Sequence, residues 1–403
     1  MNHRSGRHFL QIPGPTNVPD RVLRAMAAPT IDHRGPEFAR LARAVLGGVR
    51  NLAGTVRPVA LYPSSGTGAW EAALVNTLSP GDKVLAFETG HFAVLWAAMA
   101  ADLGLDVDLV PGDWRSGADP EQVFGRLSAD AGHAVKAVTV VHNETSTGTT
   151  SRIPEIRAAI DAAAHPALLI VDAISSLGSI DYRHDEWGVD VTVWCSQKGM
   201  MLPPGLGLNA VSAKALDASR DARLPRSYWT WQPLLDAADT GMFPYTPPTN
   251  LLYGLRESLA MFGEEGLPAV FARHRRHAEA TRRAVRAWGL DIVCRDPGRR
   301  AVRRRDGAGP GRGAHRAHRG PRGAGLSRTG LAVRSPVRTR VPSRSRPLPP
   351  WPRQAPGDAA ADQVRGPQPQ PGRHQGHRAG GELQYRGGVL GCGHGQVALR
   401  CQP

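Results

Sequence analysis

The feature of this sequence that most constrains its fold is the alternation of short apolar runs with amphipathic segments through residues 1–298. Short apolar runs are typical of strands that are buried on both faces of a parallel sheet. These runs are Val84–Phe87, Ala137–Val141, Ala167–Asp172 and Val189–Trp194. The segments between them that predict helices are Ala69–Leu78, Val94–Leu103 and Ile153–Ala164. Strands that alternate with helices predict a doubly wound α/β domain with a mainly parallel sheet flanked by helices.

Two longer amphipathic patterns lead out of this domain. Asn250–Phe262 and Leu267–Trp288 predict helices, and Leu290–Cys294 predicts the first strand of a second, smaller domain. We therefore expect an N-terminal arm over residues 1–20 and a large domain over residues 21–262. A linking helix and the start of the small domain follow over residues 263–298.

The composition changes abruptly after residue 298. Residues 299–403 contain 21 arginines, no lysine and 4 acidic residues, a net charge of +17, whereas the whole chain carries +15. Residues 1–298 are therefore close to neutral, and the basic charge belongs to the C-terminal segment alone. Isoleucine, methionine, phenylalanine and asparagine are also missing there, and no helical or strand period persists.

Three explanations of residues 299–403 stay open: a shifted reading frame, a disordered basic tail, and a nucleic-acid-binding arm. Codons that encode Arg304–Gly309 can be chosen so that loss of one base gives Ala-Val-Met-Val-Pro, which fits a buried strand and a turn. We favour the frameshift over the disordered tail. We rank the nucleic-acid arm last, because Trp351 and Tyr385 are the only aromatic residues available for base stacking.

Several other classes of protein are disfavoured. No apolar run approaches the roughly 20 residues of a membrane span. Residues 1–13 lack the pattern of a secretory signal. The four cysteines show no disulfide or metal spacing: Cys195, Cys294, Cys392 and Cys401. We expect a cytoplasmic protein without a metal site.

Lys198 is the first candidate for chemistry among only four lysines. Lys83, Lys136 and Lys214 lie in polar surroundings, and we expect them to be solvated. Lys198 instead follows the apolar run Val189–Trp194, so it is expected in the crevice where open α/β sheets bind ligands. Desolvation there would lower the pKa of its amine and make it a nucleophile, although a lysine can also follow a strand without any such role.

Asp172 is the second candidate, at the carboxyl end of the run Ala167–Asp172. A buried carboxylate needs a partner, and the protonated ring nitrogen of pyridoxal phosphate would be a suitable one. An aspartate at this position could equally cap a helix or form a structural ion pair.

Three glycine- and hydroxyl-rich segments also follow predicted strands or precede predicted helices. Ser64–Gly68 could wrap a phosphate at a helix N-terminus, or form an ordinary capped turn. Gly90–Phe92 places an aromatic side chain where it could stack on a ring or pack in the core. His142–Gly148 offers hydroxyls that could bind a cofactor's ring oxygen or cap a turn.

Together these segments resemble the class V aminotransferases of fold type I, and within them the serine–glyoxylate and alanine–glyoxylate enzymes. The resemblance rests on Ser65–Gly68, His142–Gly148, Val171–Ala173, Ser196–Lys198 and Pro203–Gly205, and extends from about residue 14 to 296. The segments 224–229 and 243–254 resemble the bacterial serine–glyoxylate branch. The resemblance implies a homodimer that uses pyridoxal 5′-phosphate to transfer an amino group from L-serine or L-alanine to glyoxylate.

The resemblance also implies a role for each site residue. Lys198 would bind the cofactor covalently and move the proton at the reacting carbon. Asp172 would hold the ring nitrogen, with Ile174 beneath the ring and Phe92 above it. The remaining cofactor contacts would be Thr145 to the ring oxygen, Ser65, Gly66, Thr67 and Gln197 to the phosphate, and Tyr245 and Thr246 to the phosphate of the neighbouring subunit.

The sequence departs from the family at its C-terminus. The family's small domain carries an arginine that binds the substrate carboxylate, and nothing in residues 299–403 matches that motif. We therefore expect poor folding and little or no turnover from the chain as written. The alternatives are a non-catalytic relic and a basic-tailed nucleic-acid-binding protein. A cysteine desulfurase is disfavoured, because Cys195 lies in a strand end rather than on a mobile loop.

Overall fold

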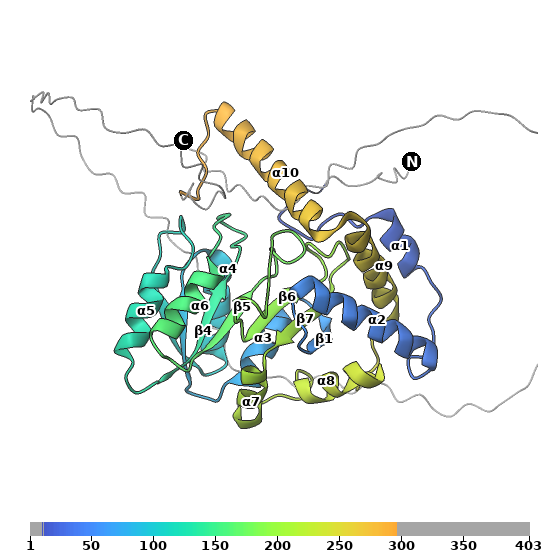
Figure 1. Ribbon diagram of the computed structural model, residues 1–403, viewed down its shortest axis with the longest axis horizontal. Helices are drawn as coiled ribbons and strands as arrows, with labels where there is room; N and C mark the ends of the chain where they lie inside the picture. The colour runs from blue at the N-terminus through green and yellow to red at the C-terminus, as the bar shows by residue number, and fades with distance from the viewer. Residues whose placement is uncertain (1–9, 11, 296–403) are drawn as a thin grey trace, which may run out of the picture. The chain divides into compact units, whose positions relative to one another are not determined.

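The computed structural model describes residues 10 and 12–295, and the predicted α/β architecture is confirmed there. The strands are β1 Val59–Ser64, β2 Lys83–Phe87, β3 Asp106–Val110, β4 Val135–Val141, β5 Leu168–Asp172, β6 Val191–Cys195 and β7 Gly205–Val211. The helices are α1 Asp20–Met26, α2 Pro36–Ala53, α3 Gly66–Thr77, α4 His91–Asp102, α5 Pro120–Ala129, α6 Ile153–Ala162, α7 Ala213–Asp221, α8 Trp231–Thr240, α9 Thr249–Glu265 and α10 Leu267–Ala287. Helices and strands alternate from β1 to β5, and β6 and β7 follow before a series of helices (Figure 1).

The seven strands form one sheet in the order β1-β7-β6-β5-β4-β2-β3. Strands β2 to β6 are parallel, and β7 runs antiparallel to both of its neighbours. Every residue of β5 and β6 is buried, as expected for strands covered on both faces. The order reverses between β2 and β4, so a crevice for a ligand is expected beyond the carboxyl ends of those strands.

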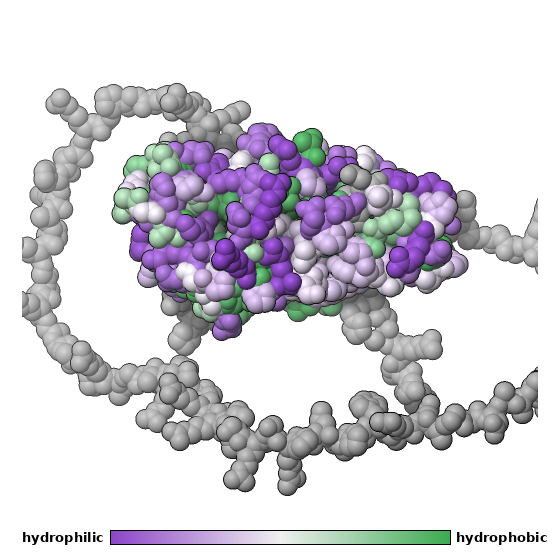
Figure 2. Space-filling model, turned by 90° about the horizontal axis from the view of Figure 1, so that it is seen from below, coloured by the Kyte–Doolittle hydropathy of each residue, from purple (hydrophilic) through white to green (hydrophobic). Residues whose placement is uncertain are grey.

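The hydrophobic core lies between the sheet and its helices. Helix α2 contributes Phe38, Val45 and Val49 at helical spacing, all with almost no exposed surface. Gly54 ends this helix in the left-handed region, at a φ of 65°, where a side chain would also meet Arg183. The face in Figure 2 is mostly hydrophilic, with hydrophobic side chains in small separate areas. Within the described residues, no helix is long and apolar enough to cross a membrane.

Two sequence expectations are wrong in detail. Residues Leu290–Cys294 form no named strand, and this segment instead lies against the loop after β3, where the Arg295 N–H donates to the Arg115 carbonyl at 3.1 Å. Helix α9 spans Thr249–Glu265, so it begins one residue before and ends three residues after the expected helix Asn250–Phe262. Residues 299–403 and the tail predictions lie outside the described residues.

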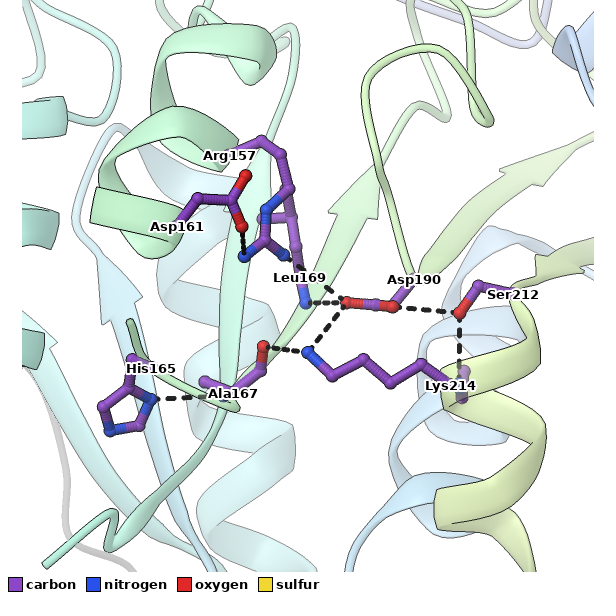
Figure 3. Close-up of polar contacts among 9 residues, drawn as sticks. Arg157, Asp161, His165, Ala167, Leu169, Asp190, Ser212 and Lys214 are labelled. Atoms are coloured by element: carbon purple, nitrogen blue, oxygen red, sulfur yellow. Dashed lines mark hydrogen bonds and ion pairs between the residues drawn. The ribbon is translucent and has the colours of Figure 1, made fainter. Parts of the chain in front are cut away.

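Lys214 is not the fully solvated lysine that the sequence suggested (Figure 3). Its ammonium donates to the Ala167 carbonyl at 2.8 Å and lies 3.7 Å from Asp190, and its side chain is only 44% exposed. Asp190 also accepts from the Leu169 N–H and the Ser212 hydroxyl, both at 2.9 Å. This cluster ties β5, β6 and α7 together at the amino ends of the strands, away from the predicted ligand crevice.

Candidate active site

The predicted site residues gather at the carboxyl ends of the parallel strands. Asp172 is the last residue of β5, and Lys198 lies three residues past the end of β6. Strand β1 runs in the same direction as β6, because each is antiparallel to β7. The Ser65–Thr67 segment after β1 therefore reaches the same edge, at the start of α3.

Asp172 is a buried carboxylate held by two donors. The Trp70 Nε1–H donates to Oδ2 at 2.9 Å, and the Ile174 N–H donates to Oδ1 at 2.6 Å. Burial raises the pKa of Asp172 to about 7, and the negative charge of Glu144 adds to the rise, while the two donors and Lys198 oppose it. The carboxylate is therefore poised to gain from a cationic partner.

Lys198 is a half-buried amine beside this carboxylate. Its Nζ donates to the Pro13 carbonyl at 3.0 Å. Burial lowers its pKa, against the opposing attraction of Cys195 and Asp172. Gly14 lies against the same amine, and a Cβ there would come within 2.5 Å of Nζ. Pro13 and Gly14 thus form one wall around the lysine, which the sequence did not predict.

The start of α3 forms another wall of the site. Ser65 precedes the helix, but its side chain accepts no hydrogen bond from the N–H groups of the first turn of α3. A Cβ at Gly66 would come within 2.5 Å of Ile174 Cδ1, which places the helix start directly against the residue expected beneath a ring. Such a glycine-lined helix N-terminus is suited to a phosphate group.

Phe92 and Thr145 lie beyond the carboxyl ends of β2 and β4. Phe92 is in the first turn of α4, half-buried, and its ring meets the Trp70 ring edge-on at 6.4 Å. Thr145 is half-buried in the loop after β4. Glu144, which precedes it, accepts hydrogen bonds from the N–H groups of Phe92 and Ala93. The structure therefore links these two predicted residues.

The remaining predicted residues are Gln197, Tyr245 and Thr246. Gln197 is next to Lys198, and its carbonyl accepts from the Thr16 N–H at 3.0 Å. Tyr245 stacks on Tyr228, with ring centroids 4.9 Å apart, and the Tyr228 hydroxyl donates to the Pro63 carbonyl near the start of α3. Thr246 is exposed.

Cys195 is buried at the end of β6, and burial raises the pKa of its thiol to about 12. A thiol in this setting is a poor nucleophile, which fits the expectation that Cys195 has no desulfurase role.

Trp70 is the functional residue that sequence reasoning missed. The signal was present, because an indole follows the Ser64–Gly68 loop by two residues and can reach the sheet edge from the first turns of the helix. Its partner, Asp172, is 102 residues away in the chain, so the pairing depends on the tertiary fold.

The described residues fit pyridoxal phosphate. Asp172 is a buried carboxylate suited to a cationic partner, Lys198 beside it is an amine with a lowered pKa, and the start of α3, which has no side-chain cap from Ser65, lies at the same edge of the sheet. The carboxylate, the amine and the helix N-terminus would hold the ring nitrogen, the carbonyl carbon and the phosphate, respectively.

Comparisons with known proteins point in the same direction. Residues 8–296 match the family described as Aminotransferase class-V. The serine–glyoxylate aminotransferase of Methylorubrum extorquens is 51% identical over 300 residues, which cover 73% of this chain and 75% of that protein. The L-aspartate–glyoxylate aminotransferase of Paracoccus denitrificans is 48% identical over 287 residues, which cover 71% of this chain and 72% of that protein.

A solved structure shows the same fold. The alanine–glyoxylate aminotransferase of Nostoc sp. superposes with a TM-score of 0.65 at 29% identity, covering 72% of this chain and 79% of that one. The family match ends at residue 296, two residues before the composition changes.

Proposed function

Because the chain belongs to the class V aminotransferase family, we propose that it transfers an amino group from L-serine or L-alanine to glyoxylate with pyridoxal 5′-phosphate as its cofactor. The observation that carries the proposal is the pairing of Asp172 and Lys198 at the carboxyl ends of β5 and β6, with the start of α3 beside them. The relatives named for glyoxylate support the acceptor, and L-aspartate joins the donors to be tested because one relative is named for it.

Asp172 would hold the cofactor through charge. When bound, pyridoxal phosphate supplies an electron sink for bond cleavage at the amino acid's Cα. An ionised Asp172 keeps a cationic ring nitrogen in place, and the donors Trp70 and Ile174 fix the orientation of the carboxylate. Ile174, whose side chain lies against Gly66, would support the ring.

Lys198 would act as nucleophile and proton carrier. Its lowered pKa increases the fraction of neutral amine that can attack a carbonyl carbon near neutral pH. The same amine would accept a proton from the substrate's Cα and deliver it to C4′, the carbonyl carbon of the cofactor. Pro13, whose carbonyl accepts from Nζ in the cofactor-free chain, gives the free amine a defined position.

The contacts of Ser65, Gly66, Thr67 and Gln197 to phosphate, Thr145 to the ring oxygen and Phe92 to the ring face belong to the proposal. So does a homodimer in which Tyr245 and Thr246 reach the neighbouring subunit's phosphate. The cytoplasmic location stays a prediction from the sequence.

The test compares the chain as written with a chain whose reading frame is restored at Arg304. The gene is first resequenced across the codons for Cys294 to Pro310. Both chains are then loaded with cofactor, reduced with borohydride and mapped by mass spectrometry, and glycine formation from glyoxylate is measured with serine, alanine and aspartate.

We expect both chains to carry the cofactor on Lys198, and only the restored chain to turn over at a normal rate. A loaded chain without label on Lys198 would refute the cofactor assignment. Failure of the restored chain with all three donors would refute the glyoxylate assignment. Normal turnover by the chain as written would show that residues 299–403 do not impair the enzyme.

A further inference from the structure

Glu144 is a completely buried carboxylate in the loop after β4. It accepts from the Ser146 N–H at 2.9 Å and the Ser146 hydroxyl at 2.7 Å, and these two hydrogen bonds hold its own loop together. It also accepts from the Ala93 N–H at 3.1 Å and the Phe92 N–H at 3.4 Å. One side chain therefore joins the loop after β4 to the start of α4.

The start of α4 needs this partner. Gly90 precedes the helix and provides no side-chain cap, so the first-turn N–H groups have no acceptor within their own segment. Glu144 and Ser146 accept from three successive N–H groups, since the Ser146 hydroxyl takes the His91 N–H at 2.9 Å. A negative charge at this position is also favoured by the helix dipole.

The space around Glu144 is closed by Gly90. A Cβ at Gly90 would lie 2.5 Å from Glu144 Cγ and 2.6 Å from the Ser146 hydroxyl. The two segments therefore touch without an intervening side chain. They meet beyond the ends of β2 and β4, where the strand order reverses and the ligand crevice is expected.

We propose that Glu144 is the positioning residue of this site, which sets Phe92 at the face of the cofactor ring and Thr145 at the ring oxygen. The inference rests on the proposed function, because it takes the pyridoxal ring as the group that these two residues contact. Glu144 acts through its neighbours and does not itself take part in the reaction.

A second effect follows from the same placement. The charge of Glu144 helps to raise the pKa of Asp172, so a neutral replacement should lower that pKa. The pH at which cofactor affinity falls off should then move downward in Glu144→Gln. A role confined to fold stability would leave this pH profile unchanged.

The experiment uses the full chain and two variants, Glu144→Ala and Glu144→Gln, with Asp119→Ala as the matched control. Asp119 also caps a helix with a carboxylate, accepting from the Glu121 N–H at 3.1 Å at the start of α5, and it is outside the site described above. Hydrogen exchange is measured on the cofactor-free proteins, and the dissociation constant and visible circular dichroism on the cofactor-loaded ones.

We expect Glu144→Ala to speed exchange at residues 91–93 about tenfold and to raise the dissociation constant of pyridoxal phosphate by a similar factor. The dichroism of the bound cofactor should also change. Glu144→Gln keeps the side-chain volume and should give a smaller rise in the dissociation constant with the downward pH shift. Asp119→Ala should lower the melting temperature while its cofactor affinity stays within about twofold of the parent.

Unchanged exchange at residues 91–93, or an affinity loss in Asp119→Ala equal to that in Glu144→Ala, would overturn the inference. Failure of the parent chain to bind pyridoxal phosphate would refute the proposed function instead. The exchange measurement would then still decide whether Glu144 joins the two segments.

Discussion

Replacing Asp172 with asparagine should make the cofactor-free chain more stable at high pH while weakening cofactor binding. Asparagine has nearly the same shape but no charge. In the parent, the folded state favours the protonated carboxyl, because burial raises its pKa from 3.8 to about 7. A buried charge that pairs with a ligand is expected to lower the free energy of unfolding when the ligand is not bound.

The sign and size follow from this shift. The folded state binds more protons than the unfolded state between the two pKa values, so the parent loses stability as the pH rises through that range. The loss is absent below about pH 3.8 and complete above about pH 7, where it reaches on the order of 4 kcal/mol. Between pH 5 and 9 the stability of Asp172→Asn relative to the parent should therefore rise by about 3 kcal/mol.

The loss of a hydrogen bond lowers the stability of Asp172→Asn by the same amount at every pH. The two oxygens of Asp172 accept from the Trp70 and Ile174 N–H groups, and asparagine can satisfy only one of these donors well. An unsatisfied buried donor costs about 1–3 kcal/mol at every pH. The pH-dependent difference is consequently the quantity to measure, since this constant term cancels from it.

The assay is urea unfolding of the cofactor-free parent and variant at several pH values between 5 and 9, with the slopes compared to exclude a change in the unfolded state. Cofactor affinity is measured in parallel and should fall by at least tenfold in Asp172→Asn, because a neutral amide cannot pair with a cationic ring nitrogen. A stability difference that stays constant with pH would refute the view that Asp172 is an uncompensated buried charge.

Three further outcomes are expected. Lys198→Ala should abolish borohydride-stable labelling by pyridoxal phosphate without a comparable loss of melting temperature, because its amine is the proposed attachment point. Trp70→Phe should raise the pKa of Asp172 further by removing a donor, so cofactor affinity should begin to fall at a higher pH than in the parent; titration of cofactor fluorescence would show this. Asp190→Ala should lower the free energy of unfolding by about 2 kcal/mol in urea melts, because the buried Leu169 N–H loses its acceptor while Arg157 keeps Asp161 as an ion-pair partner, with cofactor affinity unchanged.

The centre of the fold could be predicted from the sequence because its strands are buried on both faces. Strands β2, β4, β5 and β6 appear as mostly apolar runs, although Thr139, Asp190 and Thr192 interrupt two of them. Strands β1, β3 and β7 were not predicted. β7 contains two glycines and β3 alternates aspartate with apolar residues at the sheet edge, so neither gives such a run, and the apolar run Val59–Tyr62 of β1 is cut short by Pro63. Their place in the sheet is determined by pairing with distant strands, which local patterns do not report.

The site residues that could be predicted are those with reactive side chains at the ends of recognisable strands. Asp172 and Lys198 each follow a recognisable strand, and the topology then brings their segments to one edge. Trp70 and Pro13 could not be assigned in this way. An indole N–H and a main-chain carbonyl are common groups, and only the folded chain shows that they contact Asp172 and Lys198.

The residues proposed to bind the cofactor and the arginine expected to bind the substrate carboxylate lie in different parts of the chain. The contacts around Asp172 and Lys198 come from residues between Pro13 and Lys198, and the family match continues to residue 296. The arginine that the family uses for the substrate carboxylate is expected beyond that point, in the segment where the sequence no longer matches. A chain that keeps the first part and lacks the second should still hold pyridoxal phosphate, because the proposed contacts to the ring nitrogen, the carbonyl carbon and the phosphate all come from residues up to Thr246, within the part that matches the family. It should not orient an amino acid for proton transfer, because positioning by a bidentate arginine contributes as much to rate as the reactive groups do.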